Sequence, residues 1–256
     1  DGDAYINRGN AKANLEDYKG AVFDNNIGLE IYAKNEKNNF ELSTKDILSI
    51  DYSSDPLLIG FNKYAGFDGN SYTRPITYYI HDKKGKLNSK SLPKYFKKTY
   101  KHTLDEEKFI VNFISKIDKY IDLDFQRVNS KTNAMISIYK TNIYENIKGM
   151  AMVSYKRDDV RSRVVGVDIA WSDSKLDIPK LKKYPTLSVD SAYTIIHEIG
   201  HALGLKHMDN DRCGEYCQSN FDPEDRRINN EKTIMSYNNF LYPVDDIFFT
   251  QLDLKA

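Results

Sequence analysis

The sequence predicts an α+β protein with one sheet and two long helices, and three observations lead to this prediction. Short runs of β-branched and aromatic residues recur along residues 72–256, which is typical of strands. Two longer segments carry apolar residues at the three- and four-residue spacing of amphipathic helices. The order is strand, helix, four strands, helix. We therefore expect five strands and two helices.

The first strand is expected at Ile76–Ile80, which reads ITYYI. The helix after it should begin at Thr103, because Thr103 and Glu106 have the spacing of a capping box. Its apolar stripe consists of Phe109, Ile110, Phe113, Ile114, Ile117 and Ile121. Four more strands are predicted at residues 123–128, 134–139, 149–155 and 164–171.

The second helix should begin at Ser188 or Asp190, because either side chain can cap it. Its apolar stripe consists of Ala192, Ile195, Ile196, Ile199, Ala202 and Leu203. This stripe predicts a helix packed on a core, with His197 and His201 on the other face. A buried helix is the rigid support that a catalytic site requires.

The N-terminal 34 residues differ from the rest of the chain. Residues 4–31 show two short helical patterns and resemble a single tetratricopeptide repeat, with Gly9, Tyr18 and Ala21 at matching positions. A plain helical extension is the equal alternative. We expect a helical hairpin at residues 1–34 and a connector at 35–71. A lone hairpin cannot bury its apolar face, so it would bind a protein partner or dock on the domain that follows.

Composition restricts the function classes. The 256 residues include 37 Lys and Arg against 37 Asp and Glu, so the formal net charge is zero. This balance gives no sign of nucleic-acid binding. No apolar run approaches the roughly 18 residues of a membrane span, and no signal peptide is visible. We expect a soluble globular protein that is a piece of a longer chain.

The residues best suited to bind a metal and transfer protons lie in HEIGHALGLKH, at residues 197–207. His197 and His201 lie four residues apart on the predicted helix and can share a metal ion, with Glu198 beside its open side. A straight helix would carry His207 about 9 Å farther along the axis. The chain must therefore turn, and Gly204 is the residue that permits the turn.

This spacing predicts one zinc ion with His197, His201 and His207 as its ligands. Three of the five histidines of the chain fall in this short segment. The other two, His81 and His102, stand alone and are expected to be solvated or hydrogen-bonded.

HEIGHALGLKH resembles the extended zinc-binding sequence of the metzincin metallopeptidases, in the form of serralysin-like and matrixin-like members. TIMSY at residues 233–237 resembles their Met-turn, with Met235 beneath the metal. Taken alone, TIMSY would be a buried strand. The resemblance covers residues 72–256. It implies a twisted five-stranded sheet and a small C-terminal subdomain with the Met-turn and a helix at 246–254.

The resemblance also implies an activity, that of a zinc-dependent endopeptidase with a polypeptide substrate. Glu198 would be the general base, and Tyr237 a switchable fifth zinc ligand that stabilises the oxyanion. The strand at residues 149–155 would form the edge that pairs with an extended peptide. A secreted or extracytoplasmic location is favoured by the resemblance only.

The residues after the third histidine leave several points open. Met208 matches none of the residues usual at this position, so the subfamily is undecided. Cys213 and Cys217 are interpreted as a local disulfide or two free thiols. Asp209 and Asp211 can bind calcium, but a solvated loop is the preferred interpretation.

The expected mechanism follows from the zinc and the glutamate. Three neutral imidazoles leave an open zinc position, where a bound water has a pKa of about 7. Glu198 would take its proton and return it to the leaving amine, without a covalent enzyme intermediate. The alternative is a non-catalytic zinc-containing module that binds proteins through the tetratricopeptide-like segment. A structural zinc normally has four protein ligands and no use for Glu198, which weighs against this alternative.

Overall fold

The computed structural model describes residues 74–89, 91–121, 123–142, 147–157, 162–173, 178–205, 233–236 and 247–255. The predicted hairpin at 1–34 and the connector at 35–71 lie outside these residues. The chain divides into two compact units, and each is described by itself. The first contains the described residues up to 173 and residues 194–205. The second contains residues 178–193, 233–236 and 247–255.

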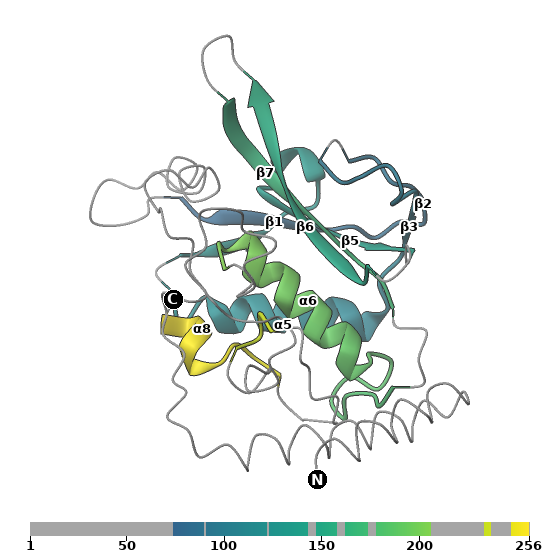
Figure 1. Ribbon diagram of the computed structural model, residues 1–256, viewed down its shortest axis with the longest axis vertical. Coiled ribbons are helices and arrows are strands. Elements are labelled where there is room, and N and C mark those ends of the chain that lie inside the picture. The colour runs from purple at the N-terminus through teal and green to yellow at the C-terminus, as the bar shows by residue number, and fades with distance from the viewer. Residues whose placement is uncertain are drawn as a thin grey trace. The chain divides into compact units, whose positions relative to one another are not determined.

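The first unit is a mixed α/β structure in which two helices accompany a curled seven-stranded sheet (Figure 1). β1 pairs in parallel with β4 and β5, and β5 pairs in parallel with β7. β6 runs antiparallel to β7, and the short β2 and β3 form an antiparallel pair joined to β5. The strands are β1 (Ile76–Ile80), β2 (Gly85–Lys86), β3 (Lys98–Tyr100), β4 (Phe125–Arg127), β5 (Ile136–Thr141), β6 (Gly149–Arg157) and β7 (Ser162–Trp171).

All five predicted strands are present, and the prediction missed β2 and β3. These two have only two and three residues, too few to show an alternating pattern. The first helix, α5 (Leu104–Ile117), begins with the predicted capping box. The Thr103 N–H donates to Glu106 at 2.7 Å, and the Glu106 N–H donates to the Thr103 hydroxyl at 3.3 Å. The prediction was wrong for Ile121, which lies beyond the end of α5.

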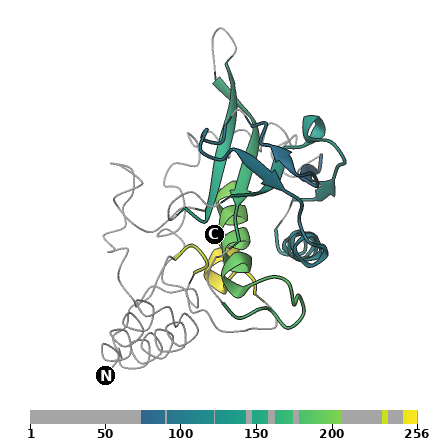
Figure 2. The same ribbon diagram turned by 90° about the vertical axis from the view of Figure 1, so that its right-hand side faces the viewer.

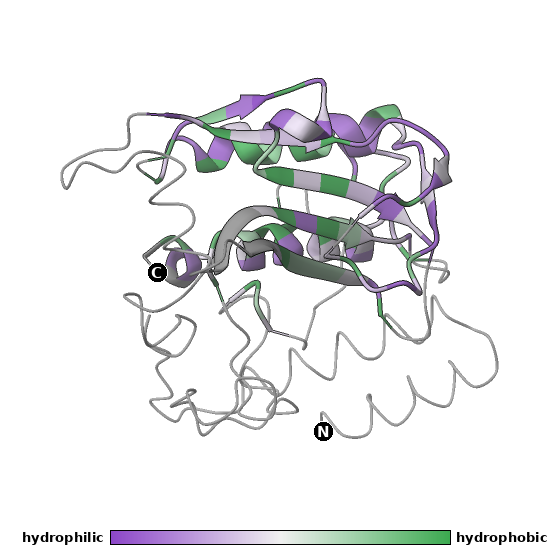
Figure 3. Cartoon of the chain, turned by 90° about the horizontal axis from the view of Figure 1, so that it is seen from above, coloured by the Kyte–Doolittle hydropathy of each residue, from purple (hydrophilic) through white to green (hydrophobic). Residues whose placement is uncertain are grey.

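The core of this unit lies between the sheet and its helices. α5 and the adjoining part of α6 (Val189–Ala202) lie on the same side of the sheet (Figures 1 and 2). Figure 3 shows apolar residues alternating with polar ones along the strands and helices. β1 shows this alternation in its burial, with Ile76, Tyr78 and Ile80 buried, whereas β5 is buried on both sides. The buried apolar residues include Ile76, Ile80, Phe109, Ile110, Phe113, Ile114, Ile138, Ile169, Ile195, Ile196 and Ile199.

The opposite face of the sheet is covered by the segment before β3. Leu92 and Phe96 pack with Tyr139 and Ala170 in a small apolar cluster. Next to this cluster, Asp168 accepts hydrogen bonds from the hydroxyls of Ser89 at 2.6 Å and Ser91 at 2.7 Å. Polar and apolar contacts together hold this segment on the sheet.

The second unit contains the start of α6, a tight turn and the short helix α8 (Gln251–Lys255). Ser188 caps α6, because its hydroxyl accepts from the Ser191 N–H at 3.1 Å. Residues 233–236 form a turn closed by a bond from the Ser236 N–H to the Thr233 carbonyl at 3.2 Å. TIMSY is therefore a turn in its described part, and the strand alternative was wrong.

The predicted helix at 246–254 begins later than expected. Residues 247–250 are not helical, and α8 starts after Thr250. The cause is a reciprocal cap, in which the Thr250 N–H donates to the Asp253 carboxylate and the Asp253 N–H donates to the Thr250 hydroxyl. Within the part of the chain that the structure describes, no helix combines the length and apolar character needed to cross a lipid bilayer.

Candidate metal centre

His197 and His201 converge on one side of α6. Their Nε2 atoms are 3.1 Å apart, and their ring planes are perpendicular. Two nitrogens that bind one tetrahedral zinc at about 2.0 to 2.1 Å lie about 3.3 Å from each other. The observed separation therefore fits two ligands of a single zinc ion. Both side chains are partly exposed, so an ion can reach them.

The backbone after α6 fixes the tautomer of His201. Its Nδ1 lies 2.8 Å from the Leu205 carbonyl oxygen. A carbonyl oxygen only accepts, so Nδ1 carries the hydrogen and the Nε2 of the neutral ring keeps its lone pair. This is the usual arrangement around a metal-binding histidine, in which the second nitrogen is held by a backbone or carboxylate oxygen.

The turn that supplies this carbonyl is the one predicted at Gly204. The Leu205 N–H donates to the Gly200 carbonyl and the Gly204 N–H donates to the His201 carbonyl, which is the Schellman pattern. Gly204 has a φ of 104°, a conformation that strains any residue with a side chain. The turn therefore ends the helix and orients His201 at once.

Glu198 lies beneath the sheet edge beside the two histidines. Its side chain is only 6% exposed. Burial raises the pKa of the Glu198 carboxyl to about 8, and a hydrogen bond from the Ala151 N–H acts in the lowering direction. A Cβ added at Gly149 would meet the Glu198 Oε1 atom at 2.5 Å. The carboxylate is thus packed against the start of β6.

β6 is an edge strand, as predicted for residues 149–155, because among the described residues it pairs only with β7. The Ser172 N–H donates to the Lys148 carbonyl at 2.9 Å, so Lys148 occupies a hydrogen-bonded position opposite β7. Every second residue from Lys148 onward therefore bonds to β7. The backbone groups of Gly149, Ala151 and Val153 face the outer edge, which agrees with the bond from Ala151 to Glu198.

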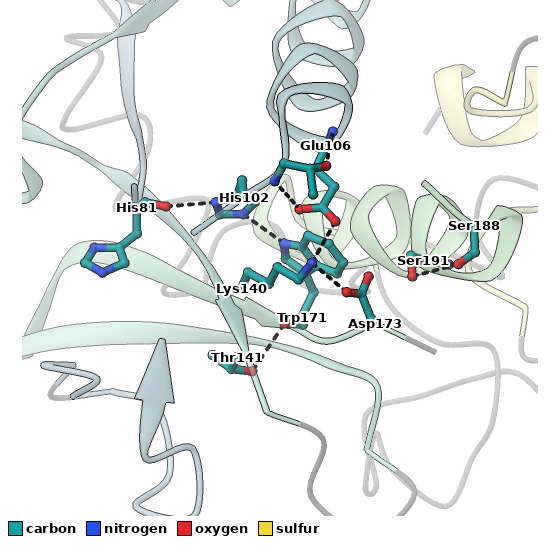
Figure 4. Close-up of polar contacts among 10 residues, drawn as sticks. His81, His102, Glu106, Lys140, Thr141, Trp171, Asp173, Ser188 and Ser191 are labelled. Carbon is teal, nitrogen blue, oxygen red and sulfur yellow. Dashed lines mark hydrogen bonds and ion pairs between the residues drawn. The ribbon is translucent and has the colours of Figure 1, made fainter. Parts of the chain in front are cut away.

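His102 is hydrogen-bonded, as expected, but it is buried and not solvated (Figure 4). The Trp171 Nε1–H donates to the His102 Nε2 atom at 3.1 Å. The His102 Nδ1–H donates to the His81 carbonyl at 2.8 Å. Burial lowers the pKa of His102 to about 4. Both ring nitrogens are used by the protein, so His102 has no position for a metal.

An ion-pair network lies beside this histidine, with Glu106 buried and Asp173 half-exposed. Lys140 donates to Glu106 at 2.7 Å and lies 2.5 Å from Asp173. Its ammonium group also lies over the Trp171 ring, 5.2 Å from the centroid. The contacts link the first turn of α5 to β5 and the end of β7 (Figure 4). This polar cluster is structural, because its members satisfy one another.

The partly buried His81 is also hydrogen-bonded. The Thr99 hydroxyl donates to the Lys83 carbonyl at 3.0 Å, so it accepts from the His81 Nε2–H at 3.1 Å. The His81 Nδ1 atom then accepts from the Tyr79 hydroxyl at 3.2 Å. The expectation of a hydrogen-bonded histidine is confirmed.

Of the predicted site residues, the structure brings together His197, Glu198 and His201. His207 and Tyr237 lie outside the described residues, as do Met208, Asp209, Asp211, Cys213 and Cys217. Met235 lies in the turn of the second unit and is buried there. Within the described ranges there is no group of three His, Cys, Asp or Glu side chains placed to hold a metal.

Sequence reasoning missed three backbone contributions to the site. The Leu205 carbonyl orients His201, the Ala151 N–H bonds to Glu198, and Gly149 leaves space for the carboxylate. Only Gly149 had a visible signal, because a glycine in a strand often marks a close approach of another group.

Comparisons with known proteins do not identify a family for this chain. No protein-family model and no curated protein matches the chain. Among solved structures, 22 chains match. One belongs to the GM1-bound form of the ECX AB5 holotoxin, with 14% sequence identity and a TM-score of 0.40 over 70% of this chain and 77% of that chain. This similarity is too low to support an argument about fold or function.

Proposed function

We propose that this protein is a zinc-dependent endopeptidase of the metzincin type. The observation that carries the proposal is the pair of Nε2 atoms of His197 and His201, 3.1 Å apart, with Glu198 on the same helix. The tautomer of His201 is the one that metal binding needs. A structural site would have no use for a buried glutamate at this position.

The residues present fit a zinc ion. His197 and His201 would hold it together with His207, and Tyr237 would approach from the Met-turn segment. When bound, zinc would act as a Lewis acid that lowers the pKa of a coordinated water and polarises the peptide carbonyl. These ligands are imidazoles, which suit zinc.

The protein's own groups would move the proton. Glu198 would accept it from the attacking water and then deliver it to the leaving amine. Its burial keeps bulk water away from the carboxyl group, so the proton can pass between the coordinated water, Glu198 and the leaving amine. The Tyr237 hydroxyl would stabilise the charge on the carbonyl oxygen.

A polypeptide substrate would pair with the edge of β6. The backbone groups of Gly149 and Val153 and the Ala151 carbonyl face outward there, while the Ala151 N–H is bonded to Glu198. An extended peptide added to this edge would gain main-chain hydrogen bonds without requiring a particular sequence. The edge position of β6 therefore favours a peptide over a small metabolite as the substrate.

The fold is consistent with a metzincin-like arrangement. An antiparallel edge strand lies beside a helix that ends in a glycine turn. In the second unit, the turn at 233–236 is tied to α8, because the Thr233 hydroxyl and the Ile234 N–H donate to Asp253. A tight turn held in this way is what the Met-turn proposal requires.

The test compares zinc content and peptide hydrolysis in three proteins. The wild type should bind one zinc per chain and digest casein. Glu198→Gln should retain the zinc and lose nearly all activity, because the general base acts on the water and not on the ion. Glu107→Gln is the matched control, since Glu107 lies on α5 in a partly exposed pair with Arg127. Zinc-loaded wild type that cleaves no peptide bond, or Glu198→Gln that cleaves at the wild-type rate, would contradict the proposal.

A further inference from the structure

Gly149 is the first residue of β6, and it leaves no room for a side chain. A Cβ at this position would lie 2.5 Å from the Glu198 Oε1 atom and 2.7 Å from the Glu198 Cγ atom. It would also lie 2.7 Å from the Thr194 methyl carbon. These separations are well below the 3.5 to 4.0 Å of ordinary carbon contacts. An alanine here would therefore displace Glu198, the helix or the strand.

Two other described glycines, Gly85 and Gly166, differ from Gly149. A Cβ at Gly85 would meet nothing within 4 Å. A Cβ at Gly166 would lie 3.0 Å from the Met135 carbonyl oxygen, a backbone contact that does not involve Glu198. The conflict with the candidate general base is thus specific to Gly149 among these positions.

The same strand also bonds to the carboxylate. Ala151 lies two residues after Gly149 on the same side of β6, and its N–H hydrogen-bonds to Glu198. β6 therefore provides both the space and a donor. Glu198 is held from two sides, by its own helix and by the strand edge.

We infer that Gly149 is a positioning residue for Glu198, and the inference rests on the proposed peptidase function. Any side chain at position 149 moves the carboxylate away from the place where it would act as general base. The strand that would pair with the substrate is then also the element that sets the position of the base. His197 and His201 lie on the helix and do not touch Gly149, so they would bind zinc independently of this contact.

The first experiment measures kcat, KM and zinc content for Gly149→Ala. We expect one zinc per chain, a KM close to that of the wild type, and a kcat lowered about a hundredfold, the scale of a displacement of about 1 Å at a catalytic group. Gly85→Ala should behave as the wild type. Gly166→Ala should melt at a lower temperature and keep its kcat, because its strain is remote from Glu198.

The second experiment needs no activity. It compares melting temperatures of the zinc-free wild type, Gly149→Ala, Glu198→Ala and the double variant. Glu198→Ala removes two of the three atoms that the new Cβ would meet, so Gly149→Ala should lower the melting temperature less in that background. An equal loss in both backgrounds would overturn the proposed contact.

The two experiments distinguish a failure of the peptidase proposal from a failure of the positioning role of Gly149. An inactive zinc-loaded wild type would end the peptidase proposal and with it the catalytic role of Gly149, while the melting cycle would still test the contact. An active wild type with Gly149→Ala as active as Gly85→Ala would overturn only the positioning role. If Gly149→Ala does not fold, Thr194→Ser is added to it, which removes the third close contact and allows the same kinetic comparison.

Discussion

The buried His102 should make the stability of this protein fall steeply in weak acid. In the folded state, its Nδ1–H donates to the His81 carbonyl and its Nε2 atom accepts from Trp171. Protonation would place an N–H group against the Trp171 N–H, where no acceptor remains. The neutral ring is therefore strongly favoured in the folded state.

The magnitude follows from the two pKa values. The pKa of His102 is about 4 in the folded protein and 6.5 in its ordinary state. Between these values the unfolded chain binds a proton that the folded chain does not, so stability decreases as the pH falls. At about 1.4 kcal/mol per pH unit, the full loss is about 3 kcal/mol. Most of it appears between about pH 6.5 and about pH 4.5, and almost none above pH 7.

The assay is urea unfolding at about pH 7.5 and about pH 4.5 for the wild type and His102→Asn. Trp171 is the only tryptophan of the chain and is fully buried, so its fluorescence reports the unfolding of this region. The wild type should lose about 2.5 kcal/mol more than the variant between the two pH values. Groups such as Glu106 titrate in both proteins and cancel in the difference.

Equal pH dependence of the free energy of unfolding in the two proteins would contradict the low pKa assigned to the folded-state His102. His102→Asn leaves the Trp171 N–H without its acceptor, which lowers stability by about 1 to 3 kcal/mol at every pH. If the variant does not fold, an NMR titration of the wild type measures the same quantity. A His102 ring that protonates near its ordinary pKa would contradict the prediction.

Three further predictions concern the ligands and the turns. His197→Ala and His201→Ala should each abolish tight zinc binding, and unchanged metal content by mass spectrometry would refute the assigned ligands. Asp253→Ala should lower the free energy of unfolding by about 3 kcal/mol, because buried donors at Thr233 and Ile234 lose their acceptor; a loss under about 1 kcal/mol would contradict this in a urea titration. Gly204→Ala should lower it by about 1 to 2 kcal/mol, the strain of a left-handed conformation, and an unchanged melting temperature would argue against the turn.

The sequence predicted elements whose patterns are local. β1 has the predicted bounds, and α5 has the predicted cap and, except for Ile121, the predicted apolar stripe, because strand alternation and helical spacing are both visible in a few consecutive residues. β6 and β7 extend beyond their predicted ends, to Arg157 and from Ser162. Their antiparallel ladder continues past the apolar residues, and main-chain pairing does not depend on the side chains there.

The candidate site likewise contains some features that local sequence spacing predicts and others that depend on distant residues. His197, Glu198, His201 and the turn at Gly204 were predictable because helix geometry relates residues a few positions apart. The environment of His102 was not, because its partner Trp171 is 69 residues away in the chain. The expectation of a solvated His102 was wrong, because the fold brings the His81 carbonyl and the Trp171 N–H to its two ring nitrogens.

The two glycines of the candidate site act through different physical causes, so their variants should fail in different ways. Gly204 is needed for its backbone angle, and its turn brings the Leu205 carbonyl to His201. Replacing it should therefore weaken zinc binding, since the orienting bond of a ligand is lost. Gly149 is needed for the volume it leaves empty beside Glu198, which is not a ligand. Substitutions at position 204 should therefore lower zinc affinity, because the Gly204 turn orients the ligand His201. Substitutions at position 149 should lower kcat, because Gly149 contacts the general base Glu198.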